Sequence, residues 1–139
     1  FTAGPISPEY YYEYNITIET NGKGTFIYKA GSETFNYSFT VTNFQLWKLT
    51  EAIDKSKILD ENIKEGEKLL GGPTKKLKVL YVNPDPNFDQ PPKVYETPYF
   101  IAKEYSENVN KLYELIVNTV PQDLFKDAQK KAEDLRNKN

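Results

Sequence analysis

The sequence contains no cysteine, no histidine and no methionine. Without cysteine the chain has neither a disulfide framework nor a thiol nucleophile, and without cysteine and histidine it lacks the ligands of most zinc sites. The absence of histidine also removes the side chain that most often acts as a general base near neutral pH. The chain therefore lacks the residues on which most metal-dependent and nucleophilic enzymes rely.

Long apolar runs and a surplus of basic residues are also absent. No run of about 18 apolar residues occurs, so we predict no transmembrane segment in this chain. The 18 basic and 20 acidic residues are mixed along the sequence and give a net charge of -2. Nucleic-acid binding requires a basic patch or stripe, so we predict no nucleic-acid partner.

The same absences bear on the compartment. Small secreted eukaryotic domains are usually rich in disulfides, whereas bacterial and archaeal exported domains often lack them. Because methionine is missing, we expect a processed form or an excised domain, and residues 1–9 are typical of a flexible leader. We therefore expect an extracytoplasmic prokaryotic protein (secreted, periplasmic or at the cell surface), lipoprotein-like, whose signal or lipid-anchoring segment was removed. A cytoplasmic domain trimmed from a longer protein is the alternative.

Aromatic residues are abundant, with 11 Tyr and 8 Phe. In residues 10–18, tyrosine and isoleucine alternate with polar residues, which is typical of a strand with one buried face. Similar patterns follow in residues 25–29 and 35–41. Asn21-Gly22 and Gly31-Ser32 separate them with residues that favour tight turns. This stretch predicts an antiparallel meander of three strands.

Helical spacing begins after the meander. Thr42 and Gln45 form a capping-box pattern, so we predict a helix over residues 43–55 that packs on the sheet. Trp47 lies off the centre of its apolar stripe, either at the edge of the helix–sheet contact or as a ligand platform. A second helix is predicted from Ser106 to Val120, before a proline. The third, over residues 122–137, has a thin apolar stripe and many charges, with spacing for an Asp127–Lys131 ion pair, so we expect it to attach loosely or to project toward a partner.

Two further strands are predicted between these helices. Residues 77–82 are apolar on both faces, which favours a central strand, and residues 94–105 form another, with Pro98 at an edge, a bulge or a break. The segments 58–72 and 83–93 are predicted as loops whose role the sequence does not define. We therefore predict one α+β domain over residues 1–139, with an antiparallel sheet of about five strands and helices on one face.

A proline-rich loop carries the one pattern that suggests a metal. Asp85, Asn87, Asp89 and Glu96 occupy positions 1, 3, 5 and 12 of an EF-hand calcium loop. Gln90 stands where that loop needs glycine, two prolines follow, and the flanks are predicted strands. The pattern therefore favours a solvated turn over a calcium site.

No sequence motif identifies a catalytic centre or a cofactor site, so we predict neither an enzyme nor a bound cofactor. The leading hypothesis is a non-enzymatic module that binds a protein partner through aromatic residues, of which Tyr11, Trp47, Tyr95 and Tyr99 are the candidates. Carbohydrate or cell-wall binding through exposed Tyr and Trp is one alternative. A hydrolase or metal-dependent enzyme that uses carboxylates alone is the other, and would need two carboxylates gathered in a cleft.

Overall fold

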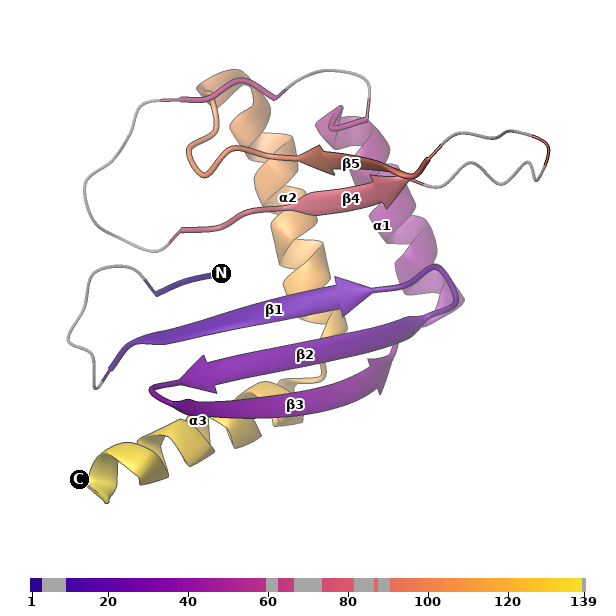
Figure 1. The fold of residues 1–139 in the computed structure, drawn as a ribbon. Coiled ribbons are helices and arrows are strands. Elements are labelled where there is room, and N and C mark those ends of the chain that lie inside the picture. The colour runs from indigo at the N-terminus through magenta and orange to yellow at the C-terminus, as the bar shows by residue number, and fades with distance from the viewer. Residues whose placement is uncertain (4–9, 60–62, 67–73, 82–86, 88–90, 139) are drawn as a thin grey trace.

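A computed structural model describes residues 1–3, 10–59, 63–66, 74–81, 87 and 91–138 (Figure 1). The predicted α+β class is confirmed, but the strands form a three-stranded and a two-stranded sheet instead of a single sheet. The elements, in chain order, are β1 (Tyr12–Ile18), β2 (Lys23–Ala30), β3 (Glu33–Thr40), α1 (Asn43–Ser56), β4 (Lys78–Tyr81), β5 (Lys93–Glu96), α2 (Lys103–Thr119) and α3 (Gln122–Asn137).

The predicted meander is the three-stranded sheet, with strand order β1-β2-β3 and both pairs antiparallel. Two glycines make its turns, Gly22 with φ of 89° and Gly31 with φ of 62°. At Gly22 a side chain would also meet the Val41 carbonyl oxygen at 2.7 Å, so this turn excludes larger residues. The tight turns fix the register and thereby place the aromatic residues of all three strands on one face.

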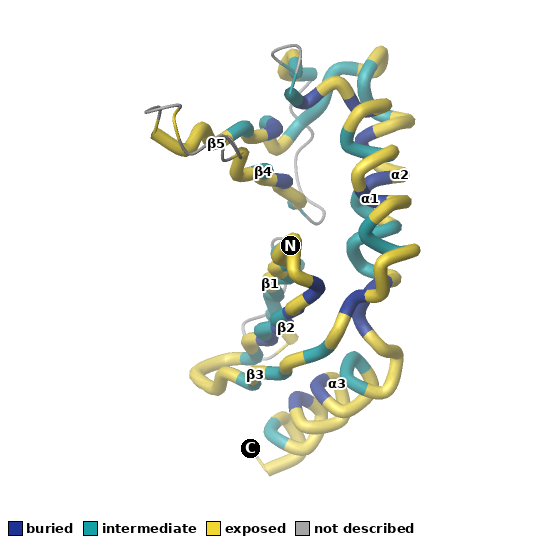
Figure 2. The backbone as a smooth tube through the Cα atoms, turned by 90° about the vertical axis from the view of Figure 1, so that its right-hand side faces the viewer, coloured by how far each residue is buried: buried dark blue, intermediate teal, exposed yellow. Residues whose placement is uncertain are grey.

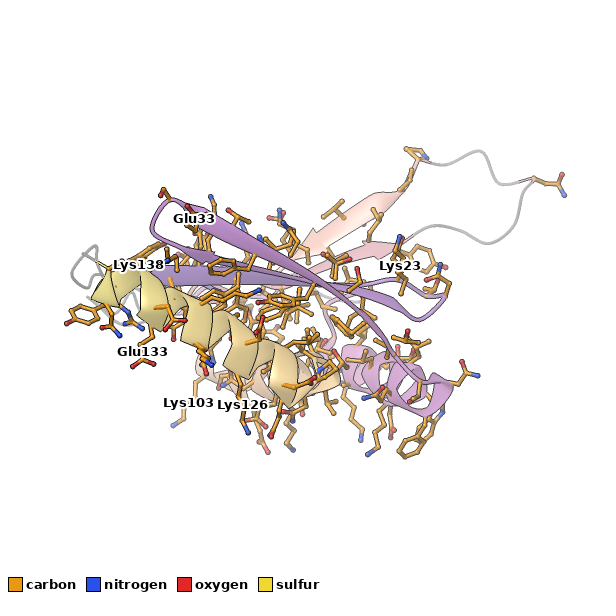
Figure 3. All side chains as sticks on the ribbon, turned by 90° about the horizontal axis from the view of Figure 1, so that it is seen from below. Lys23, Glu33, Lys103, Lys126, Glu133 and Lys138 are labelled. Atoms are coloured by element: carbon orange, nitrogen blue, oxygen red, sulfur yellow. The ribbon has the colours of Figure 1, made fainter. Side chains whose placement is uncertain are left out.

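Helix α3 covers that aromatic face (Figures 1 and 3). The Phe26 side chain is fully buried, and its ring centroid lies 4.4 Å from that of Phe125 on α3. Ala128 and Ala132 are also buried, in the same cluster as Phe26. Helix α3 therefore packs against the meander through Leu124, Phe125, Ala128 and Ala132.

Polar contacts on the same helix reinforce this packing. The Tyr37 hydroxyl donates a hydrogen bond of 2.8 Å to Asp127, and Asp127 forms the predicted ion pair with Lys131 at 3.0 Å. The hydrogen bond from Lys131, and then that from Tyr37, lowers the pKa of the Asp127 carboxyl.

A second apolar cluster joins α1, α2 and the smaller sheet. Figure 2 shows α1 and α2 as a layer beside the two sheets. Leu49 of α1, Leu112 of α2 and Leu77, which precedes β4, are buried together with Ile58. Helix α1 begins as predicted, because Gln45 N–H donates to the Thr42 hydroxyl while the Gln45 side chain accepts from Thr42 N–H. Among the described residues, no helix is long and apolar enough to cross a membrane.

The second half of the chain departs from prediction at two places. Strand β4 was expected to be central, but in the described residues it pairs only with β5, and Leu80 on it is exposed. The strand predicted over residues 94–105 ends at Glu96, because Pro98 has no N–H to donate. Helix α2 consequently begins at Lys103 instead of Ser106.

Residues 1–3 connect the two sheets. Thr2 forms an antiparallel bridge with Glu13 of β1 and another with Thr74, just before β4. The predicted flexible leader of residues 1–9 therefore starts with residues held by backbone hydrogen bonds, while residues 4–9 lie outside the described part of the chain.

The burial of Ala128 gives a direct test of how α3 is attached. We expect Ala128→Leu to lower the free energy of unfolding by about 1–3 kcal/mol, because a larger side chain has no space against the meander. Gln129→Leu, at the exposed neighbouring position, should change it by less than about 0.5 kcal/mol. Urea denaturation followed by circular dichroism measures both; equal effects would mean that α3 does not pack as described.

Tyrosine burial predicts loss of stability at high pH. Burial raises the pKa of the Tyr28 hydroxyl from 10.0 to about 12, with a smaller contribution from Tyr12. The folded state then holds this proton more tightly than the unfolded chain, so its stabilisation is complete below pH 10.0 and is lost as the pH rises through about 12. We expect Tyr28→Phe to make the urea midpoint fall less steeply as the pH rises over this range, which urea titrations at a series of pH values measure.

Candidate binding surface

The four predicted binding residues do not form one site. Tyr11 lies just before β1, where its hydroxyl donates a 3.4 Å hydrogen bond to Glu13. Tyr95 packs against the second apolar cluster, and the ammonium of Lys93 lies 4.7 Å from its ring centroid. Tyr95 is therefore in part a core residue.

Trp47 is exposed on α1. Its side chain is 60% exposed and stacks on Phe44, which is 63% exposed, with ring centroids 6.2 Å apart. The Lys48 ammonium lies 4.7 Å from the centroid of the Phe44 ring, a cation–π contact. These residues form a small aromatic platform in the first turns of one helix.

A second uncovered surface lies on the outer side of β4 and β5, turned away from α1 and α2. We call it the hairpin face. Leu80 and Val94 sit directly opposite each other in the β4–β5 register and are 63% and 54% exposed. The next pair on this face is Lys78 and Glu96. The hairpin face thus combines an apolar pair with a charged pair.

Charge on the hairpin face is arranged around Glu96. Its carboxylate lies 3.1 Å from the Lys76 ammonium and 3.2 Å from that of Lys78. Hydrogen bonds from Lys76, and then from Lys78, lower the pKa of Glu96. The Lys76 ammonium also lies 5.0 Å from the ring centroid of Tyr99, which is exposed. Tyr99 is therefore the predicted binding residue that lies beside this surface.

Of the four residues of the calcium pattern, Asn87 and Glu96 lie in the described part of the chain. Glu96 points its carboxylate at two lysines, which compete with a cation for it. Asn87 is exposed, and Asp85 and Asp89 lie outside the described residues. Within the described ranges, no group of three acidic side chains is placed to hold a metal ion.

Two grooves border α1 and α2. The first, of about 220 Å³, contains Glu51 as its one carboxylate, and Glu51 pairs with Lys55 at 3.3 Å. The second, of about 240 Å³, contains Glu104 as its one carboxylate. Neither groove gathers the two carboxylates that glycoside hydrolysis would require.

Sequence reasoning missed Leu80 and Val94. Residues 77–82 are apolar at every position but one, and this was interpreted as burial on both faces. In a two-stranded sheet covered on one side, the same pattern leaves the outer residues in solvent. No protein-family model, curated protein or solved structure matches this chain.

Because the Glu96 carboxylate is ion-paired with Lys76 and Lys78, we predict that calcium does not bind to it. We expect millimolar calcium to leave the thermal midpoint unchanged at constant ionic strength, because a ligand stabilises a protein only when it binds the folded state. Differential scanning calorimetry with calcium, and with magnesium as the control, measures this. A midpoint that rises with calcium alone and falls back in Asp85→Asn would show that the loop binds the ion.

Proposed function

We propose that this chain is a non-enzymatic protein-binding module of an exported prokaryotic protein, and that the hairpin face contacts the partner. The observation that supports this proposal is the exposed cross-strand pair of Leu80 and Val94. Single apolar residues are normal on a protein surface, whereas adjacent exposed apolar residues with a polar rim are a feature of interfaces.

The neighbouring groups suit such a contact. Lys78 and Lys76 share the Glu96 carboxylate at the edge of the apolar pair, so this rim carries one net positive charge, which an acidic group on the partner would complement. Tyr99 adds an aromatic side chain beside them, and aromatic residues often contribute most of the binding energy at interfaces. The expected partner surface is apolar at its centre and polar at its rim.

A second candidate function is carbohydrate binding through the platform of Trp47 and Phe44. Its support is that both rings are exposed and nearly parallel, with an interplanar angle of 21°. An aromatic face of this kind can stack on a sugar ring. The platform is confined to one helix, however, and Tyr99 does not extend it, so the protein partner is the better-supported proposal.

The exported location is part of the proposal and rests on composition. A chain of 139 residues without cysteine folds in an oxidising compartment without forming wrong disulfides. Fractionation of the source cells, followed by immunoblotting, tests it. Recovery with the cytoplasmic marker would contradict it.

The hairpin face can be tested by cross-linking and substitution. A photoreactive residue at position 80 should cross-link a specific protein in the source cells, and that protein should then be purified. We expect Leu80→Ser and Val94→Ser each to weaken its binding by about tenfold or more, since each removes an apolar contact at the centre of the interface. Isothermal titration calorimetry measures the affinity.

Stability controls separate binding from folding. Leu80→Ser and Val94→Ser should leave the thermal midpoint nearly unchanged because both side chains are exposed. Val79→Ser, on the inner face of the same strand, should lower it. If Trp47→Ala weakens binding of an isolated glycan while the two serine variants have no effect on any ligand, carbohydrate binding replaces the proposal.

A further inference from the structure

The two grooves beside α1 and α2 adjoin each other. Lys55 of α1 and Asn108 of α2 line both of them. Lys48, in the first half of α1, shares the first groove with Leu115, near the end of α2, so the two helices run antiparallel. We treat the two grooves as one surface and call it the helix groove.

The helix groove is separate from the hairpin face. Figure 2 shows the two sheets on one side of α1 and α2. Leu49 and Leu112, which are buried in the cluster shared with the smaller sheet, do not line the groove. None of the residues of the hairpin face lines it either. The groove therefore belongs to a surface of the helix pair that the sheets do not cover.

The floor of the helix groove is apolar. Ala52 of α1 and Leu115 of α2 are half-buried and pack against the second apolar cluster. Both also line the groove, so the cluster is partly open to solvent along this side. Apolar side chains of a partner that lie on this floor would remove the exposed part of the cluster from water, which favours binding.

Lysine predominates among the charged residues of the groove. Four of its lining residues are lysines and two are glutamates, although the whole chain has a net charge of -2. Two ion pairs reach residues outside it, Lys111 with Glu107 at 3.3 Å and Glu104 with Lys64 at 3.8 Å. Counting these two outside residues leaves the excess of positive charge unchanged, so the groove is complementary to an acidic partner.

The lysines of the groove can exchange their present contacts. Glu51 and Lys55 form an exposed pair at 3.3 Å, four residues apart on α1, and such pairs are weak. Lys48 pairs with no carboxylate among the described residues, and its ammonium lies 4.7 Å from the centroid of the Phe44 ring. Phe44 is one turn earlier on the same side of the helix, so an exposed aromatic ring borders the groove at this end.

We propose that the helix groove binds an acidic amphipathic helix of a protein partner. The apolar face of that helix lies on Ala52 and Leu115, and acidic side chains beside this face pair with Lys48 and Lys111. From Phe44 to the end of α1 the surface is roughly 20 Å long, which about 14 residues of a partner helix would cover. An amphipathic helix in a groove is a common mode of peptide recognition. The proposal rests on the protein-binding function but concerns a surface distinct from the hairpin face.

A capped peptide tests the groove. The peptide acetyl-Leu-Glu-Gln-Leu-Leu-Gln-Glu-Leu-Glu-Gln-Leu-Leu-Gln-Glu-amide has an apolar stripe at helical spacing with glutamate on both sides of it. In an NMR titration of the labelled protein, we expect the amide signals of Ala52, Asn108 and Leu115 to shift and those of Leu80 and Val94 to stay. The same peptide with glutamine in place of every glutamate should bind at least about tenfold more weakly, because it cannot pair with the lysines.

Variants separate a groove from a general attraction to acidic peptides. We expect the double substitution Lys48→Gln with Lys111→Gln to weaken binding at least about fivefold, while Lys126→Gln on α3, a loss of one positive charge outside the groove, has little effect. Ala52→Lys adds a positive charge but fills the floor, so it should also weaken binding. Leu80→Ser should leave peptide binding unchanged, which distinguishes failure of the groove from failure of the hairpin face.

Thermal midpoints show which variants are folded, and if Ala52→Lys is not, the neutral peptide and the lysine variants decide. The proposal is wrong if the acidic and neutral peptides bind equally, or if Ala52→Lys strengthens binding. It is also wrong if the acidic peptide does not bind at millimolar concentration. If an oligogalacturonate shifts Ala52 and Leu115 where the peptide does not, the groove takes an acidic glycan instead.

Discussion

The contact between Phe26 and Phe125 is the interaction on which the rest of the structure depends. Phe26 lies at the centre of the meander, and its ring contacts Tyr14, Tyr28 and Tyr37 as well as Phe125. Aromatic side chains bury more area than any others, so a few of them can provide a core for a small sheet. Helix α3 covers this face, and the opposite face of the meander is mostly polar, with Ile27 between Asn15 and Asn36 and with a Glu13–Lys29 ion pair.

The aromatic cluster under the meander and the second apolar cluster, beneath α1 and α2, are connected at two places. Val120 is buried with the aromatic residues, whereas Leu112, earlier on the preceding helix, is buried with Leu49 and Leu77. Pro121 ends that helix, so the chain changes direction between the two clusters. Thr2 makes the other connection, from the opposite side of the molecule. Among the described residues, β4 and β5 pair only with each other, and Leu80 and Val94 on their outer face are exposed.

Local signals in the sequence predicted most of the fold. The capping pair Thr42 and Gln45 placed the start of α1, and Pro121 placed the boundary between α2 and α3. Pairing between distant strands was not predictable, because hydrophobic periodicity defines the faces of a strand but not its neighbours. The thin apolar stripe of α3 likewise did not indicate that Ala128 and Ala132 would be buried against the aromatic face. Of the candidate residues, Trp47 and Tyr99 are exposed, while Tyr95 has the same aromatic character and packs against the core.

The position of Trp47 determines how this molecule can be observed. It is the one tryptophan in the chain, and it lies on the surface, outside both apolar clusters. Its fluorescence in the folded state should resemble that of tryptophan in water, so unfolding would hardly shift the emission. The stacked tyrosines of the meander are instead held in fixed, asymmetric surroundings and should give a strong near-ultraviolet dichroism that vanishes on unfolding. The same tryptophan is, for that reason, a reporter of contacts made at the surface of α1.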